Sequence, residues 1–257
     1  MTEGTGTGAK PLDAKPIDTK PIETKLTDIK ANEIKTLDAR LIRGVLFDLD
    51  GTLVDTAPDL VLALNLALKD FGLPSESLED IRFAASHGSL ALVNAAQPHL
   101  NDEEKATIQQ GLLNHYHRVN GQAARLFDGM ASLLEHLNEQ RIPFGVVTNK
   151  AARFARPLLH RLELAHKMPA IISGDSTTQS KPHPAPMRLA ASQLSVCCEQ
   201  ILYLGDAKRD LEAARNSDML GGIAHWGYIG NNDQAHLWPH DFGFDTPLAV
   251  LELLKQG

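Results

Sequence analysis

The segment Val45-Leu46-Phe47-Asp48-Leu49-Asp50-Gly51-Thr52 is an apolar run that ends in two carboxylates two positions apart. The apolar run predicts a buried strand. Since side chains alternate along a strand, Asp48 and Asp50 should project to the same side and meet one object. Like charges held this close need a metal ion, a division of labour between a nucleophile and an acid, or both.

The chain from Gly129 onward alternates between helical and strand patterns. Strands are expected at residues 143–148, 170–173, 201–204 and 222–225. Helices are expected at residues 129–140, 151–162, 184–194, 206–217 and 246–255. With a first strand at 41–48, this alternation predicts an α/β fold with a mostly parallel sheet covered by helices on both faces.

The stretch between Ala57 and Gly121 contains no good strand pattern. Its apolar positions instead predict helices at residues 57–71, 78–83, 90–97 and 102–120. An all-helical block is therefore expected to be inserted just after the first strand of the α/β core.

The first forty residues repeat with a period of five, as in Lys10-Pro11-Leu12-Asp13-Ala14. Five residues advance a helix by about 500°, so the apolar positions do not form a stripe. Prolines 11, 16 and 21 also oppose a helix. We expect residues 1–40 to be a disordered, charge-balanced tail.

The charge distribution excludes some classes of partner. Residues 1–40 carry seven cations and seven anions, so the net charge of −7 belongs to residues 41–257. An acidic body without a basic stripe gives no support for binding to nucleic acid or an anionic membrane.

The adjacent Cys197 and Cys198 imply no disulfide framework, and no apolar run approaches 18 residues. A cytoplasmic protein is expected. The sequence does not identify a protein partner.

Ligands of open parallel sheets bind beyond the carboxyl ends of the strands. Besides Asp48 and Asp50, three further segments lie at such ends or in an adjoining loop. Thr148-Asn149-Lys150 comes at the end of strand 143–148, and Gly205-Asp206 follows strand 201–204, with Asp210 one helical turn later. Ser180-Lys181-Pro182 lies in the loop between these two segments. These segments should bring carboxylates, a hydroxyl and an ammonium to one edge of the sheet.

This assortment suits phosphoryl transfer to a carboxylate, since an anionic nucleophile reaches a phosphate ester only when positive charge covers the phosphoryl oxygens. Mg²⁺ between Asp48, Asp206 and the phosphate would supply most of that charge. Lys181 adds a fixed positive charge, and the Thr148 hydroxyl donates to a phosphate oxygen. Asp50 would protonate the leaving alkoxide and later deprotonate the attacking water.

Four segments of the chain resemble the four motifs of the haloacid dehalogenase (HAD) superfamily in residue type, order and spacing. They are Asp48-Leu49-Asp50-Gly51-Thr52-Leu53-Val54-Asp55-Thr56, Val147-Thr148-Asn149-Lys150, Ser180-Lys181-Pro182 and Gly205-Asp206-Ala207-Lys208-Arg209-Asp210. The resemblance covers residues 42–255. It implies a Rossmann-like core at 41–58 plus 126–257, with a mobile helical cap inserted at 59–125.

The resemblance also implies a role for each site residue. By this resemblance Asp48 is the nucleophile, and Asp50 is the acid/base, whose backbone carbonyl also binds Mg²⁺. The phosphate binders are Thr148, Asn149 and Lys181. Asp206 is a metal ligand, and Asp210 supports the metal site or Lys181. The implied activity is a Mg²⁺-dependent phosphatase that works through an aspartyl-phosphate.

Shorter stretches bear on the substrate, which we expect to be a small phosphorylated metabolite. Residues 55–60 resemble phosphoglycolate phosphatases, which favours a small phosphoglycolate-like ester. Residues 126–130 are similar to N-acetylmuramic acid 6-phosphate phosphatases, so that ester or another sugar phosphate is the alternative. Ser86-His87-Gly88-Ser89 resembles the substrate-specificity loop of related caps, which makes His87 a candidate contact for a substrate carboxylate or sugar.

Two further functions remain as alternatives. A phosphomutase would share the nucleophile and the acid/base, but the family's mutases carry a cap histidine near the position of Pro58 and Asp59, where this chain has none. A catalytically silent binding protein, with the repeat tail as its interaction element, is disfavoured by the intact set of site positions.

Overall fold

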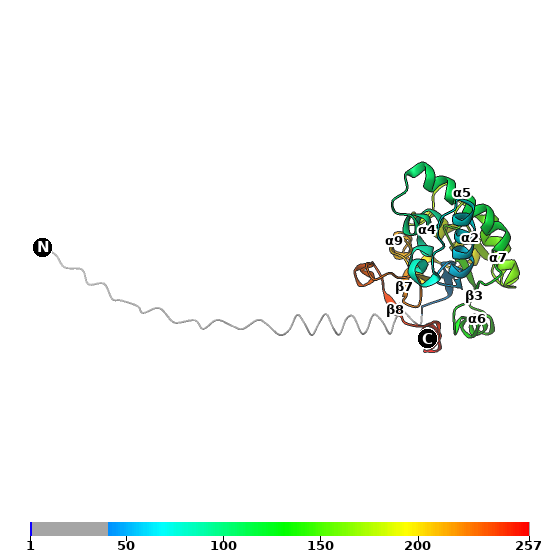
Figure 1. Ribbon diagram of the computed structural model, residues 1–257. Helices are drawn as coiled ribbons and strands as arrows, with labels where there is room; N and C mark the ends of the chain where they lie inside the picture. The colour runs from blue at the N-terminus through cyan, green and yellow to red at the C-terminus, as the bar shows by residue number, and fades with distance from the viewer. Residues whose placement is uncertain (2–40, 257) are drawn as a thin grey trace. The chain divides into compact units, whose positions relative to one another are not determined.

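The structure, a computed structural model, describes Met1 and residues 41–256 (Figure 1). Apart from Met1, the predicted disordered tail at residues 1–40 lies outside the described residues. Among the helices that are described, none combines the length and the apolar character needed to cross a bilayer.

A parallel six-stranded sheet forms the core, with β1 (Gly44–Phe47) near its centre. The strand order is β5-β4-β1-β6-β7-β8, and every neighbouring pair runs parallel. The remaining strands are β4 (Phe144–Val147), β5 (Ala170–Ile172), β6 (Ile201–Gly205), β7 (Leu220–Ala224) and β8 (Phe242–Phe244). The predicted α/β fold class is confirmed. The sequence reading missed β8, a three-residue strand with glycine at its centre.

Helices cover both faces of this sheet, as the continuous apolar strands predicted. On one face α6 (Met130–Glu139), α7 (Ala152–Arg161) and α10 (Pro247–Lys255) pack against Val45 and Phe47. On the other face α8 (Ala185–Leu194) and α9 (Lys208–Asn216) pack against Leu46 and Tyr203. Since side chains alternate along β1, one strand contributes to both hydrophobic clusters.

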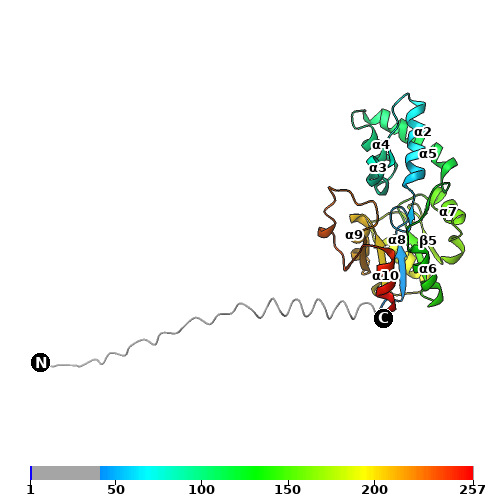
Figure 2. The same cartoon turned by 60° about the horizontal axis from the view of Figure 1, so that its bottom comes forward.

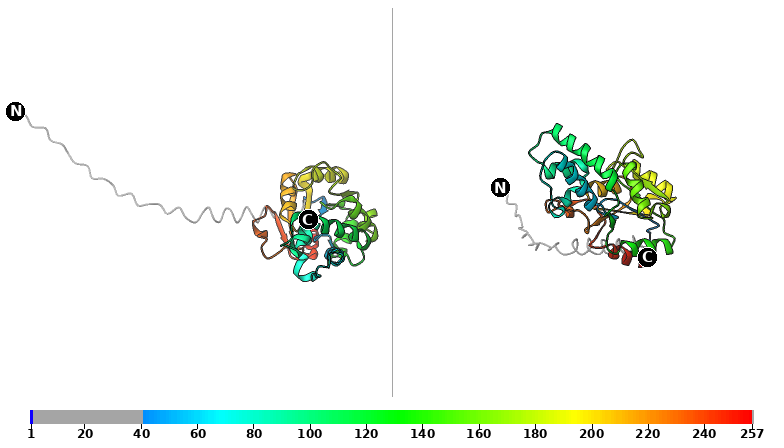
Figure 3. Two further views of the ribbon diagram at one scale, coloured as in Figure 1. Left: turned by 45° about the horizontal axis from the view of Figure 1, so that its top comes forward. Right: turned by 45° about the vertical axis from the view of Figure 1, so that its right-hand side comes forward.

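The segment after β1 forms the predicted helical insertion. It contains α2 (Ala57–Asp70), α3 (Leu78–Ile81), the 3₁₀ helix η1 (Arg82–His87), α4 (Ser89–Ala96) and α5 (Asp102–Val119). These helices share their own hydrophobic cluster, which includes Leu64 and Leu112. They gather to one side of the sheet (Figure 2; Figure 3, right), as an inserted cap. The cap limits at 59 and 125 stay a prediction.

The chain enters and leaves the cap through two very short strands. β2 (Val54–Asp55) pairs antiparallel with β3 (Arg125–Leu126). Asp59, fully buried in the first turn of α2, accepts hydrogen bonds from the backbone N–H groups of Gly121 (2.7 Å), Ala123 (2.8 Å) and Ala124 (3.1 Å). This carboxylate therefore holds the outgoing chain against the incoming helix. Two-residue strands carry no periodic signal, which is why the sequence did not predict this pairing.

Candidate active site

A buried lysine joins the carboxyl ends of two strands. Asp48 follows β1 directly, and its carboxylate accepts a hydrogen bond from Lys181 Nζ at 2.8 Å. The same ammonium contacts Asp210 Oδ1 at 2.8 Å and the Tyr203 hydroxyl at 2.7 Å. The side chains of Lys181, Asp48 and Asp210 are at most 3% exposed. Burial raises the pKa of Asp48, and the positive charge of Lys181 opposes that shift.

Asn149 positions the backbone of Lys181. Its side-chain carbonyl accepts from Lys181 N and its amide donates to Lys181 O, both at 3.0 Å. Both the carbonyl and the NH₂ group of Asn149, a predicted phosphate binder, therefore bond to the loop that carries Lys181. Tyr203 adds a second restraint, because its hydroxyl donates to the backbone carbonyl of Val147 at 2.9 Å while contacting the ammonium.

Three carboxylates form an acidic cluster beside this lysine. Oxygen atoms of Asp48, Asp206 and Asp210 lie within 4.8 Å of one another, and all three residues are buried. Burial, then the charges of Asp48 and Asp210, raises the pKa of Asp206 to about 7. Hard oxygen donors with excess negative charge suit a divalent cation such as Mg²⁺. The donor set therefore fits the ion that the sequence predicted.

A cap residue reaches into the same cluster. The Ser86 hydroxyl donates to Asp206 Oδ2 at 2.5 Å and lies 3.4 Å from the backbone oxygen of Asp50. From the core side, Arg209 Nη2 donates to the backbone oxygen of Ser86 at 2.5 Å. A side chain at Gly51, whose φ is +87°, would lie 2.2 Å from Asp206 Oδ2, so only glycine fits at this turn. Cap and core thus meet directly at the acidic cluster.

Asp50 occupies a different environment from Asp48. Its Oδ1 accepts from the Thr56 hydroxyl at 2.5 Å and from Lys150 Nζ at 2.8 Å. The Lys150 side chain is 8% exposed, and the charge of Asp50 is the main factor that raises its pKa against the effect of burial. The two aspartates that are neighbours in sequence are therefore each paired with a separate lysine.

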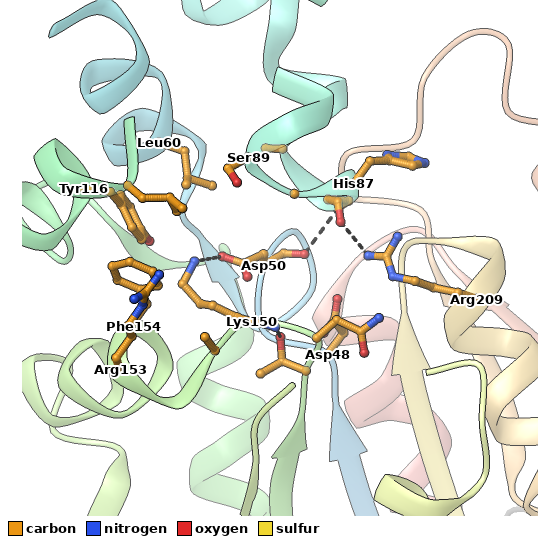
Figure 4. Close-up of a pocket in the computed structure, with 17 residues that line it drawn as sticks. Asp48, Asp50, Leu60, His87, Ser89, Tyr116, Lys150, Arg153, Phe154 and Arg209 are labelled. Atoms are coloured by element: carbon orange, nitrogen blue, oxygen red, sulfur yellow. Dashed lines mark hydrogen bonds and ion pairs between the residues drawn. The ribbon is translucent and has the colours of Figure 1, made fainter. Parts of the chain in front are cut away.

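A cavity of about 410 Å³ opens beside both aspartates. Thr148 lines it as a buried residue, and its hydroxyl accepts from Lys150 N at 3.1 Å. His87 also lines the cavity and is exposed. Figure 4 shows Tyr116, Lys150 and Phe154 to one side of Asp50, with Asp48 and Arg209 to the other.

A tyrosine after β7 links the acidic cluster to the cap entrance. The Tyr228 backbone N–H donates to Asp206 Oδ2 at 2.9 Å. Its hydroxyl accepts from Thr56 N and Ala57 N at 2.7 and 2.9 Å, and donates to Asp55 Oδ1 at 2.8 Å. Arg82 of the cap pairs with Asp55 at 2.8 Å and lies over the Tyr228 ring.

The structure brings all the sequence-predicted positions together around one edge of the sheet. Ser86, Lys150 and Arg209 stand in segments that the sequence pointed to, but no role was assigned to them there. Tyr116, Tyr203 and Tyr228 were not singled out, and of these three Tyr203 carried a usable signal, as a polar side chain in the otherwise apolar strand β6. The others reach the site through long-range packing.

Comparison with known proteins locates this arrangement in a family. A family model described as haloacid dehalogenase-like hydrolase matches residues 45–220. A phosphoglycolate phosphatase from Xanthomonas campestris pv. campestris is 36% identical over 213 residues, which cover 83% of this chain and 96% of the relative. An N-acetylmuramic acid 6-phosphate phosphatase from Pseudomonas aeruginosa is 35% identical over 217 residues, 84% of this chain and 96% of the relative.

Solved structures share the fold. The crystal structure of a predicted phosphoglycolate phosphatase from Haemophilus somnus superposes with a TM-score of 0.73 at 29% identity, covering 83% of this chain and 98% of that chain. A putative phosphoglycolate phosphatase from Lactobacillus delbrueckii has the same TM-score at 22% identity, covering 82% of this chain and 98% of that chain. This chain therefore shares its fold with both solved structures.

Proposed function

We propose, since this chain belongs to the family of haloacid dehalogenase-like hydrolases, that it is a phosphatase that hydrolyses a small phosphate monoester through an aspartyl-phosphate on Asp48. One observation carries the proposal. The Asp48 carboxylate lies buried between the Lys181 ammonium and two further carboxylates, with Asp50 two residues away on the wall of the same cavity. A nucleophile, a fixed cation and an acid/base thus share one edge of the sheet.

The first half of the reaction assigns one step to each aspartate. An Asp48 carboxylate oxygen bonds to phosphorus while the bond from phosphorus to the alcohol oxygen breaks. Asp50 gives its proton to that oxygen, so the alcohol leaves uncharged. The Thr148 hydroxyl donates to a phosphoryl oxygen, and the positive charge of Lys181 stabilises the phosphoryl group electrostatically. Lys150 and Thr56, which both donate to Asp50 Oδ1, keep this carboxyl group oriented for the transfer.

The second half returns the site to its starting state. The Asp50 carboxylate takes a proton from a water molecule, and the water oxygen bonds to phosphorus as the bond to Asp48 breaks. Inorganic phosphate is released, and Asp50 again carries the proton for the next turnover.

We assign the Mg²⁺ site to Asp48, Asp206 and the backbone carbonyl of Asp50. When bound, the ion neutralises charge on the phosphoryl oxygens and so lets an anionic nucleophile approach. Asp210 has a supporting role, because its two carboxylate oxygens accept from Lys181 Nζ and from Ala207 N. Asn149 likewise acts through Lys181, whose backbone it holds.

The substrate is expected to be a phosphoglycolate-like ester, with N-acetylmuramic acid 6-phosphate or another sugar phosphate as the alternative. Both expectations rest on relatives of nearly equal identity, 36% and 35%. A screen of phosphorylated metabolites that includes both esters decides between them.

The Asp48→Asn variant tests the nucleophile. The amide cannot form the aspartyl-phosphate, so hydrolysis of p-nitrophenyl phosphate should fall by at least about 10³-fold, while the melting temperature shows that the fold persists. The control is Asp245→Asn, an exposed carboxylate beside β8 that should leave turnover unchanged. Appreciable turnover by Asp48→Asn would rule out the assignment.

A further inference from the structure

The cap supplies a buried hydroxyl that makes no regular hydrogen bond among the described residues, although the Lys150 ammonium lies close enough to interact with it. This is the hydroxyl of Tyr116, a residue of α5 that is 1% exposed and lines the catalytic cavity. A buried hydroxyl without a partner is costly, so native structures usually provide one. The polar atom therefore points to a ligand group inside the cavity.

The Tyr116 ring is held in place from two sides. Phe154 packs against it with 5.3 Å between ring centroids, and Lys150 Nζ lies over the ring at 4.6 Å from its centroid. The second contact is a cation–π interaction that fixes the ammonium beside the phenol. One of the three N–H groups of Lys150 donates to Asp50 and another interacts with the Tyr116 hydroxyl, which leaves one for a ligand.

The reaction geometry determines which part of the substrate reaches this pair. Phosphorus must lie against Asp48, and the ester oxygen must lie against Asp50, which protonates it. The alcohol part then extends beyond Asp50, on the side where Tyr116 and Lys150 lie (Figure 4). The cavity volume of about 410 Å³ is within the usual range of about 300–1,000 Å³ for small-molecule sites, so it has room for an alcohol part there.

The chemistry of this wall favours an anionic acceptor. Tyr116 and Lys150 both offer donors, and the Arg153 guanidinium, stacked on Phe154 at 4.8 Å, lines the same cavity from its exposed position. Leu60 and Leu113 complete an apolar surface beside them. A carboxylate accepts from such donors and brings no competing proton.

We propose that the Tyr116 hydroxyl and the Lys150 ammonium together bind a carboxylate on the alcohol part of the substrate, so that this enzyme selects phosphate monoesters of hydroxy acids. The inference rests on the proposed phosphatase function and adds the subsite that chooses among its substrates. Tyr116 is the specificity residue that can be tested cleanly, because Lys150 also contacts the acid/base Asp50.

Three pairs of esters test the carboxylate; the first two replace it by a hydroxymethyl group, and the third removes the whole lactyl group that carries it. They are 2-phosphoglycolate with 2-hydroxyethyl phosphate, 3-phosphoglycerate with glycerol 3-phosphate, and N-acetylmuramic acid 6-phosphate with N-acetylglucosamine 6-phosphate. For at least one pair, the unmodified enzyme should show a kcat/KM at least tenfold higher for the acid. Equal kcat/KM within every pair would overturn the inference even when p-nitrophenyl phosphate is hydrolysed. Failure to hydrolyse any ester would instead reject the phosphatase function.

The Tyr116→Phe variant keeps the ring and removes only the hydroxyl. We expect KM for the preferred acid to rise about tenfold with kcat within twofold, and both constants for its uncharged partner to stay within twofold. The control is His117→Ala, at an exposed position on the same helix, which should leave kcat and KM unchanged for both esters of the pair. An equal loss for acid and uncharged partner would show a structural role and contradict the proposal.

Binding measured without turnover provides a second readout. In the Asp48→Asn background, adding Tyr116→Phe should weaken calorimetric binding of the preferred acid about tenfold and leave binding of inorganic phosphate unchanged. Unchanged binding of the acid would refute the carboxylate subsite.

Discussion

The Lys181 ammonium contacts Asp48, which lies 133 residues away in the sequence, and also Tyr203 and Asp210, which lie 22 and 29 residues away. A buried ammonium is stable only when anions and hydrogen-bond acceptors surround it, and a buried carboxylate is stable only beside cations and hydrogen-bond donors. Each of these groups thus makes the burial of the others tolerable. Asp206 lies outside this pairing, and its pKa of about 7 reflects burial and the neighbouring negative charges.

Asp206→Asn should separate metal binding from folding. The substitution removes one of three clustered carboxylate charges, so the metal-free protein should melt at the same temperature or higher. For the unmodified protein, Mg²⁺ at about 100 times its Kd should stabilise the fold by about 2.7 kcal/mol, which corresponds to roughly 5–10 °C. Differential scanning calorimetry with EDTA and with Mg²⁺ measures both effects.

In Asp206→Asn the Mg²⁺-dependent rise in melting temperature should disappear, whereas the Asp245→Asn control should retain it. A full rise in Asp206→Asn would remove this residue from the metal site. EDTA should also abolish turnover of the unmodified protein, and added Mg²⁺ should restore it.

At the scale of elements, the β2–β3 pair carries the cap on two short strands. Asp59 secures this connection because its carboxylate accepts three backbone N–H groups from the returning chain. Tyr228 holds the same region from the core side through Thr56 N, Ala57 N and Asp55. Polar contacts at its entrance therefore fix the cap together with the contacts that Ser86 makes at the acidic cluster.

Asp59→Asn should destabilise the protein without touching the reacting groups. An amide keeps one acceptor oxygen but turns an NH₂ group toward backbone donors, so the free energy of unfolding should fall by about 2–3 kcal/mol. The melting temperature should drop by roughly 4–12 °C. Glu139→Gln, an exposed residue at the end of α6, is the matched control and should melt within about 1 °C of the parent. An unchanged melting temperature for Asp59→Asn would contradict the anchoring role.

At the scale of the whole molecule, the cap helices pack around one hydrophobic cluster, which Phe154 and Tyr228 of the core also join, and cap and core meet at the candidate active-site cavity. Asp48, Asp50 and Thr148 come from the core wall, while Ser86 and Tyr116 come from the cap wall. The proposed reacting groups thus come from the core, and the proposed carboxylate subsite combines Tyr116 of the cap with Lys150 of the core.

Deletion of residues 2–40 should leave catalysis intact. The hydrophobic clusters begin at Ile42, and every assigned site residue lies between Asp48 and Asp210. The kcat/KM of the shortened chain should stay within twofold of the full chain, as measured with p-nitrophenyl phosphate. Loss of folding or a larger drop in kcat/KM would give the repeat segment a structural role.

Much of the core was predictable because its signals are local. Continuous apolar runs such as Phe144–Val147 predicted central parallel strands, and the periodic helix Asp102–Val119 was predicted within one residue. The exceptions are β2 and β3, which are too short for a period to register, and β8, which has a glycine at its centre. The family could also be predicted from the sequence, because its four motifs are short and are defined by the types of their residues.

The sequence by itself determined the α/β fold, the inserted helical cap and the order of the candidate catalytic residues, because each depends on local pattern. Only the tertiary structure decided how Asp48 and Asp50 are separated, one held by Lys181 and the other by Lys150 and Thr56. It alone placed Tyr116 and Ser86 of the cap over the strand ends. Contacts between segments tens to hundreds of residues apart depend on packing, which no local spacing encodes.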